Sequence, residues 1–306
     1  MGDAGTMNTP VKNNKNSIPQ LVFRPEFEVS GIEQAQTSEV ARKLSTLERV
    51  WNIDGVRKFV ILLSLIVVWQ AYTVGFDVEP LMLPSFWLSF STLIRDLFYS
   101  DLIWKVWFSI KVLIIGYSAG LFLAAILILW ATVSRFGSDF ISMSTAMFNP
   151  LPAIALLPLA MLWFGLGTAS LVFVLIHSVL WAVALSTHSG FEGVSQTLRM
   201  IGRNYGLKGF GYVWKILVPA ALPSILAGMK IGWAFAWRTL IGAELVFGAS
   251  SGSGGLGWYI FESSQNIDTD GVFAGLFMVI LIGFFVENIV FRNIERRTVN
   301  RWGMQR

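Results

Sequence analysis

The stretch VLIIGYSAGLFLAAILILWA, residues 112–131, decides the fold because it contains no charged side chain. About 20 mostly apolar residues in α-helical conformation cross the hydrocarbon core of a bilayer. Five more stretches are apolar over a similar length, and they occupy residues 59–76, 140–163, 168–185, 224–247 and 272–291. The sequence therefore predicts an all-α membrane protein with six transmembrane helices between residues 59 and 291.

The composition of the whole chain supports the same conclusion. Of the 306 residues, 54% are hydrophobic and only 14% are charged, whereas about a quarter of the residues are charged in a typical soluble domain. So few charges cannot cover a soluble protein of this length, and such high hydrophobicity excludes disorder over most of the chain. The absence of cysteine excludes a disulfide scaffold and a cysteine-ligated metal site.

The Lys and Arg residues of the connecting segments set the orientation, since cytoplasmic loops are enriched in them. If the N-terminus is cytoplasmic, the outer segments hold only Arg95 and Lys105, and the outer loop 248–271 holds none. We therefore expect both termini in the cytoplasm, with a polar extension over 1–58 and a basic tail over 292–306. Topology accounts for most of the basic residues, so we expect contact with membrane lipid and not with nucleic acid. No stretch in the extension is apolar enough for a signal peptide.

Two segments depart from a plain transmembrane helix. Residues 85–99 are amphipathic, and we expect a helix along the outer surface that serves either as an anchor or as a partner-binding element. Segment 140–163 contains Pro150, Pro152 and Pro158, each of which removes a backbone donor and kinks a helix. A broken helix at membrane depth is tolerated where it faces protein or a wet cavity. This helix therefore either lines a solute path or contains a kink tolerated between packed helices.

Three ionisable residues fall within the predicted helix over 224–247, where charges are costly to insert. At about 1.5 Å per residue, Lys230 lies in the inner part of the bilayer, Arg238 past its middle and Glu244 near its outer edge. Arg238 and Glu244 are too far apart for an i, i+4 pair. One hypothesis is that Arg238 supplies positive potential to the path of an anionic solute, and the alternative is a structural salt bridge. Lys230 is expected to extend to the inner surface.

The predicted path residues can now be collected from the broken helix and the charged helix. They are Pro150, Pro152, Pro158, Lys230, Arg238 and Glu244.

The connection over 188–223 is too long to be an idle loop. Ser195 is a suitable N-cap for a helix, and Gly206 is a suitable residue to end it. The apolar face of this helix is formed by Leu198, Ile201 and Tyr205, and a basic stripe is formed by Arg199 and Arg203. The pattern suits docking into a groove on another protein, or a helix that lies on the inner leaflet.

A second short helix is expected over 210–217, ending at Pro219. Together the two helices resemble the cytoplasmic signature of the permease subunits of ABC importers, which reads Glu-Ala-Ala, three residues, Gly, nine residues, Ile, one residue and Leu-Pro. The positions that match are Gly206, Ile216 and Pro219. The Glu-Ala-Ala positions are occupied by Met200, Ile201 and Gly202, so the acidic residue is missing.

Further stretches are similar to the nitrate, sulfonate and taurine branch of that family. They are PLPAIALLPLAMLWFGLG (150–167), LVPAALPSILAGMKIGWAFAW (217–237), GAELVFG (242–248), SGGLGWYI (253–260) and IERRTVNRWG (294–303). The resemblance implies a type I importer permease in the bacterial inner membrane that carries a small anion such as nitrate, an alkylsulfonate or taurine. Related members carry other solutes, including vitamin precursors.

The resemblance also implies partners. Two permease copies, as a homodimer or with a close paralogue, form the pore, a cytoplasmic ABC ATPase dimer grips the 188–223 connection, and a periplasmic solute-binding protein docks outside. This chain has no GxxxxGK[ST] sequence for a phosphate-binding loop, so ATP and Mg are used by the partner and the chain itself needs no cofactor. The resemblance assigns ATPase coupling to Arg199, Ile201, Gly202, Arg203, Tyr205, Gly206, Ile216 and Pro219.

Other patterns are weaker. Gly252, Gly254 and Gly257 spell GxGxxG, but a dinucleotide site needs a preceding strand and a later acidic residue, so we expect a flexible re-entrant or gate-forming loop. His177 and His188 offer no metal cluster, and His177 is expected to be a hydrogen-bonded structural residue. A membrane-embedded lipid enzyme would need a nucleophile and a base on nearby helix ends, and none is evident. A passive channel would not need the docking connection.

Overall fold

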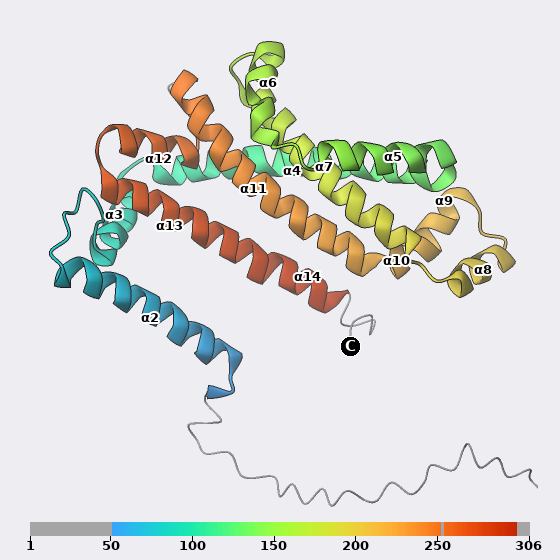
Figure 1. The fold of residues 1–306 in the computed structure, drawn as a ribbon, viewed down its shortest axis with the longest axis horizontal. Helices are drawn as coiled ribbons and strands as arrows, with labels where there is room; N and C mark the ends of the chain where they lie inside the picture. The colour runs from blue at the N-terminus through green and yellow to red at the C-terminus, as the bar shows by residue number, and fades with distance from the viewer. Residues whose placement is uncertain (1–50, 252–253, 299–306) are drawn as a thin grey trace, which may run out of the picture. The chain divides into compact units, whose positions relative to one another are not determined.

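The computed structural model describes residues 51–251 and 254–298, and every regular element within those ranges is a helix (Figure 1). The chain divides into two compact units, Met1–Leu62 and Leu63–Arg306, and the packing described below is that of the second. Most of the predicted extension over 1–58 lies outside the described residues. The last part of the predicted tail, 299–306, does so too.

Four helical segments of the described chain are long and apolar enough to cross a bilayer. They are α2 (Asp54–Gly75), α4 (Leu102–Val133), α7 (Thr168–Glu192), and α13 (Thr269–Phe285) with its continuation through η4 (Val286–Phe291) into α14 (Arg292–Arg297). Two bent helix pairs raise the number to six if each pair is one span. The chain is therefore a multi-pass membrane protein.

The first bent pair corrects the expectation for segment 140–163. It is not one kinked helix, because α5 (Arg135–Phe148) ends before the prolines and the chain turns by 90° into η2 (Ala153–Leu156) and α6 (Leu157–Phe164). Pro150 and Pro152 lie in the break between them. Pro158 bends nothing, since it lies in the first turn of α6, where its missing N–H would have no partner anyway.

The second bent pair turns by 78° and lies at the end of the long connection. Its first part is a continuous run of helical turns, α9 (Gly209–Tyr212), η3 (Val213–Leu217) and α10 (Val218–Ala220), and its second part is α11 (Leu222–Ser251). The expectation that the short helix ends at Pro219 is confirmed to within one residue, because the helical run ends at Ala220. The π-helical turn η3 lies directly before Val218 and Pro219.

Helix α7 packs along both α4 and α11, and Figure 1 shows α7 and α11 next to each other with α4 behind them. Small residues allow the close approach. A Cβ atom on Gly116 of α4 would lie 2.5 Å from Cβ of Leu175, and one on Gly228 of α11 would lie 2.7 Å from Cβ of Ser186. Packing through small residues is the usual mode of helix association in lipid. The large apolar side chains that this packing leaves outside, such as Phe122 and Leu162, suit contact with lipid.

The outer segment 85–99 forms the predicted helix. It is α3 (Phe86–Tyr99), and the Ser85 hydroxyl accepts a hydrogen bond from the backbone N–H of Leu88 at its start. The loop expected over 248–271 is mostly not a flexible loop, because α12 (Leu256–Gln265) packs against α11 and α13 within it. Gly252 of the GxGxxG pattern lies outside the described residues.

Candidate coupling surface and translocation cavity

Helix α8 (Gln196–Asn204) has the start and the end that the sequence predicts. The Ser195 hydroxyl accepts a hydrogen bond from the backbone N–H of Leu198 at 3.4 Å. Gly206 adopts φ +69°, and the N–H groups of Gly206 and Leu207 donate to the carbonyls of Arg203 and Gly202 at 2.9 and 3.0 Å. These two bonds are those of a Schellman C-cap, so local hydrogen bonds fix the length of α8.

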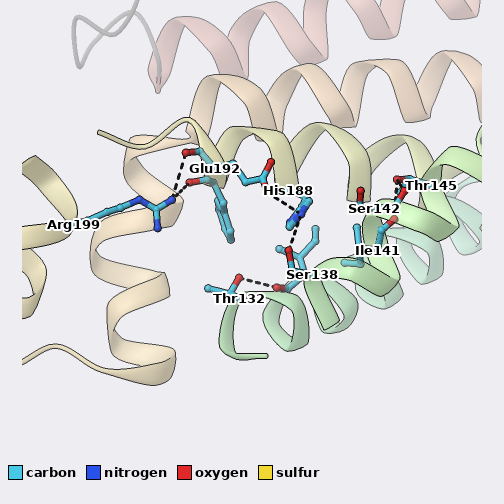
Figure 2. Close-up of polar contacts among 10 residues, drawn as sticks. Thr132, Ser138, Ile141, Ser142, Thr145, His188, Glu192 and Arg199 are labelled. Carbon is cyan, nitrogen blue, oxygen red and sulfur yellow. Dashed lines mark hydrogen bonds and ion pairs between the residues drawn. The ribbon is translucent and has the colours of Figure 1, made fainter. Parts of the chain in front are cut away.

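Arg199 joins α8 to the end of α7 (Figure 2). Its Nη2 donates to the Phe191 carbonyl at 2.6 Å and its Nε to the Val194 carbonyl at 3.1 Å, with a longer contact to the Glu192 carbonyl. The last carbonyls of a helix lack partners within it, and a cation there also interacts favourably with the helix dipole. Arg199 thus clamps α8 to α7 instead of extending away from the protein.

A second contact holds α8 against the following helical run. A Cβ atom on Gly202 would lie 3.0 Å from both Cγ1 of Ile216 and the ring of Tyr212. Glycine at this position therefore allows the closest approach of α8 to η3. It stands in the last of the three Glu-Ala-Ala positions of the family signature, where alanine is the usual small residue.

The opposite face of this helical pair is apolar and uncovered. Tyr205 is 80% exposed, and Ile201 and Leu198 are about half as exposed. Further large exposed side chains of this region are Met200, Phe210 and Trp214. Arg203 lies on the exposed side as well. Clustered exposed apolar side chains with polar neighbours mark a surface that another protein or a membrane covers.

His188 links α7 to α5 near the same end of the bundle (Figure 2). Its Nε2 lies 3.3 Å from the Ser138 hydroxyl and 3.5 Å from a carboxylate oxygen of Glu192. Helix α7 continues through His188 to Glu192, so the connection to α11 begins later than the predicted residue 188. No group of three or more potential metal ligands occurs among the described residues.

Three predicted path residues meet at one cavity of about 270 Å³. Pro150 and Pro152 contribute the broken backbone between α5 and η2, and Arg238 contributes from α11. The remaining lining residues are Phe148, Asn149, Leu151, Ala153, His177, Ser178, Trp181, Phe235 and Thr239. The Ser178 hydroxyl donates to the Thr239 hydroxyl at 3.0 Å and so joins α7 to α11 at the cavity wall.

Arg238 has no acidic partner among the residues that the structure describes. Its Nε donates to the Ala234 carbonyl at 3.0 Å, and its guanidinium lies 5.2 Å from the centre of the Phe235 ring. The salt-bridge alternative therefore has no support within the described part of the chain.

Two polar side chains of the cavity were not among the predicted path residues. The two ring nitrogens of His177 and the indole nitrogen of Trp181 are buried. None of these three atoms has a hydrogen-bond partner among the described residues. The expectation that His177 is a hydrogen-bonded structural residue is therefore wrong. The i, i+4 spacing of the two residues was the available signal, since it places them on one face of α7.

The other two charged path residues lie elsewhere. Nζ of Lys230 pairs with Oε2 of Glu295 in α14 at 2.6 Å, so its charge is matched within the chain. The fully buried Glu244 accepts hydrogen bonds from the Ser109 hydroxyl and the Gly257 N–H at 2.7 and 2.8 Å. Glu244 thus connects α11 to α4 and to the start of α12, away from the cavity lining.

Comparison with known proteins identifies the class. Residues 116–300 match the family "Binding-protein-dependent transport system inner membrane component", and the chain belongs to this family. Similar proteins include the taurine transport system permease protein TauC of Escherichia coli, 32% identical over 49% of this chain and 53% of that protein. The putative aliphatic sulfonates transport permease protein SsuC of Bacillus subtilis is 30% identical over 61% of this chain and 66% of that protein.

A third relative is matched over more of its length. The nitrate import permease protein NrtB of Synechocystis is 24% identical over 81% of this chain and 91% of that protein. By contrast, the chain spans between about half and two thirds of the other relatives named here. Together these similarities confirm the resemblance to the nitrate, sulfonate and taurine branch.

Proposed function

We propose that the chain is the permease subunit of an ATP-driven importer in a bacterial inner membrane. It crosses the membrane six times, with each bent pair counted as one span, so both termini lie on the same side, and the distribution of Lys and Arg supports the cytoplasmic side. Two copies form the solute path, a cytoplasmic ABC ATPase dimer binds the exposed face of α8 and the following helical run, and a periplasmic solute-binding protein docks on the outer surface. Hydrolysis of ATP takes place in the partner, which supplies the site for ATP and Mg.

The observation that carries this proposal is the combination of an exposed apolar face on α8 with the Arg199 clamp beneath it. A helix that merely lay on lipid would need no rigid attachment to a transmembrane helix. Here the exposed face, containing Ile201 and Tyr205, belongs to a helix bonded to the last carbonyls of α7. A push on α8 is therefore transmitted to α7.

Helix α7 carries that movement to the cavity. It is continuous from His177 at the cavity to Glu192 beside the clamp, a distance of about 22 Å along its axis. The Ser178–Thr239 bond passes the movement on to α11. Movement of α7 and α11 against the broken α5–η2 segment opens the path alternately to either side.

A small anion is the proposed solute. Support comes from the taurine, sulfonate and nitrate named in the relatives' descriptions and from Arg238, whose charge has no acidic partner within the described chain.

Site-specific crosslinking tests the docking surface, and the absence of native cysteine makes it direct. We expect Tyr205→Cys to crosslink to the co-expressed ATPase in membranes. The matched control is Met82→Cys, whose side chain is equally exposed but lies in the predicted outer segment. Crosslinking to the ATPase from position 82 and not from position 205 would overturn both the orientation and the docking surface.

A further inference from the structure

We propose that the cavity between the α5–η2 break, α7 and α11 is a binding site for a small oxyanion, nitrate or a short alkylsulfonate, in which Arg238 matches the charge and His177 and Trp181 complete the hydrogen bonds. This inference rests on the proposed function for its solute class. It adds that the membrane part itself selects the solute, in addition to any selection by a binding protein outside.

The charge of the lining has one sign. Arg238 is the single residue with a full formal charge at neutral pH among the residues that line the cavity, and no Asp or Glu is among them. A cation without a carboxylate nearby attracts an anion and repels a cation. The cavity therefore favours anions.

The guanidinium is held in place and still has donors available. Its Nε is occupied by the Ala234 carbonyl, and the Phe235 ring lies under its face. Its terminal nitrogens make no hydrogen bond to any described residue. The edge formed by its two terminal nitrogens is therefore free, and a guanidinium edge binds two oxygens of a sulfonate or nitrate in bidentate fashion.

The ring donors supply a second observation that points to a ligand. The nitrogens of His177 and Trp181 are buried yet lack partners among the described residues, and both residues line the cavity. Buried polar groups are nearly always hydrogen-bonded in native proteins, and an exception requires an explanation. An oxyanion that accepts from the indole N–H and from one imidazole N–H pairs with two of these three nitrogens.

The walls fix the size of the ligand. Phe148 stacks on Trp181 at 5.0 Å between ring centres, and the Ser178–Thr239 bond holds α7 against α11. A cavity of about 270 Å³ lies just below the usual range of about 300–1,000 Å³ for small-molecule sites. It therefore suits a small ion or molecule better than a peptide.

The alternative to a solute as the binding partner of Arg238 is a second copy of the chain. The side chain is exposed in the single chain, so an acidic residue of the other copy is the competing partner. If Arg238 joins two copies, its replacement by an uncharged residue lowers dimer stability. If it binds the solute, the dimer is unchanged and anion binding is lost.

Calorimetric titration of the whole transporter in nanodiscs, without the binding protein, tests the site with sodium ethanesulfonate and sodium nitrate as probes. We expect saturable binding by the unchanged protein, and a loss of affinity of about tenfold or more in Arg238→Gln because a charge-assisted bond is removed. Trp181→Phe keeps an aromatic ring beside Phe148 but removes the indole N–H together with part of the ring, so we expect a loss of about threefold to tenfold. Ethylammonium chloride should not bind.

Two matched variants outside the cavity control the measurement. Lys230→Gln removes the neighbouring cation of α11, which pairs with Glu295, and Trp163→Phe removes an indole from an exposed position. Both should bind the probes as the unchanged protein does. The proposal is overturned if the unchanged protein binds neither probe, if Arg238→Gln binds as before, or if Arg238→Gln dissociates the dimer.

ATP-driven uptake measured in parallel separates this inference from the proposed function. Uptake by a protein that binds neither probe would overturn the anion site and leave the importer intact. Anion binding that is sensitive to Arg238 and Trp181, without any ATP-driven uptake, would leave the site intact and overturn the importer.

Discussion

At the scale of single residues, Glu244 is the buried charge that most directly holds the described bundle together. Its carboxylate accepts hydrogen bonds from Ser109 and from the Gly257 N–H, and Ser109 also accepts one from the Leu256 N–H. Because these partners are buried, we expect Glu244→Ala to lower the free energy of unfolding by about 2–4 kcal/mol through unpaired polar groups and an added cavity. Thermal unfolding in detergent measures the change.

The matched control for this variant is Glu79→Ala, which removes an exposed carboxylate. It should shift the unfolding temperature little, since exposed charges contribute little. Equal shifts for the two variants would show that the buried network around Glu244 does not stabilise the fold.

Tyr259 lies in α12, outside the candidate spans. Its environment predicts that the stability of the fold depends on pH. Burial, and then the hydrogen bond that its hydroxyl donates to Asp96 of α3 at 2.6 Å, raise the pKa of Tyr259 above its usual value. A raised folded-state pKa means that this contribution to stability is complete below the unfolded value of about 10 and is lost as the pH rises above it. We expect the unfolding temperature to fall between pH 9 and about 11.

The variant Tyr259→Phe isolates this contribution. It should be less stable than the unchanged protein at pH 8, because the buried Asp96 loses a donor, and it should show a smaller fall at high pH. The same fall in both proteins would assign the pH dependence to other groups.

At the scale of secondary-structure elements, the attachment of α8 to α7 is the feature on which the proposed coupling depends. We expect Arg199→Ala to leave α8 capped by Ser195 but free of α7, so that amide hydrogen exchange over residues 196–204 becomes faster. Hydrogen–deuterium exchange with mass spectrometry measures this directly.

Arg203→Ala is the control, because Arg203 lies in the same helix without a clamp of this kind. If both variants exchange as the unchanged protein does, the clamp does not hold α8, and the proposed transmission from α8 to α7 fails.

At this scale, the structural features that depend on neighbouring residues were predictable from the sequence. The contacts between one helix and another were not. Ser195 and Gly206 predict the ends of α8 because caps depend on neighbouring residues alone. The apolar stretches predict the long helices for the same reason. The clamp made by Arg199 reaches only five to eight residues back along the chain, but it depends on the turn over 193–195 that sets α8 against α7, and the pattern of α8 does not encode that turn.

The cavity was predictable only in part. The prolines and Arg238 stand out in the sequence because each is unusual in a membrane helix. His177 and Trp181 do not, since an aromatic or histidine side chain on an apolar helix is ordinary. Glu244 stands out equally, yet it belongs to a structural network. Its position along the predicted helix does not reveal that Ser109 and the start of α12 lie beside it.

At the scale of the whole molecule, the described chain has a membrane part and an exposed apolar face on α8, and among its described residues no group of potential metal ligands. In the proposed mechanism, movement passes from that face through the Arg199 clamp and α7 to the cavity walls. The proposed function requires an assembly with an ATPase and a binding protein, so the test uses the assembled transporter.

Uptake of labelled ethanesulfonate or nitrate into proteoliposomes that contain the chain, its ATPase and its binding protein is the most direct test. With ATP present on the cytoplasmic side, we expect accumulation against the gradient, and loss of accumulation in Ile201→Asp, which places a charge on the docking face. Accumulation that proceeds without ATP, or that is undiminished in Ile201→Asp, would contradict the account.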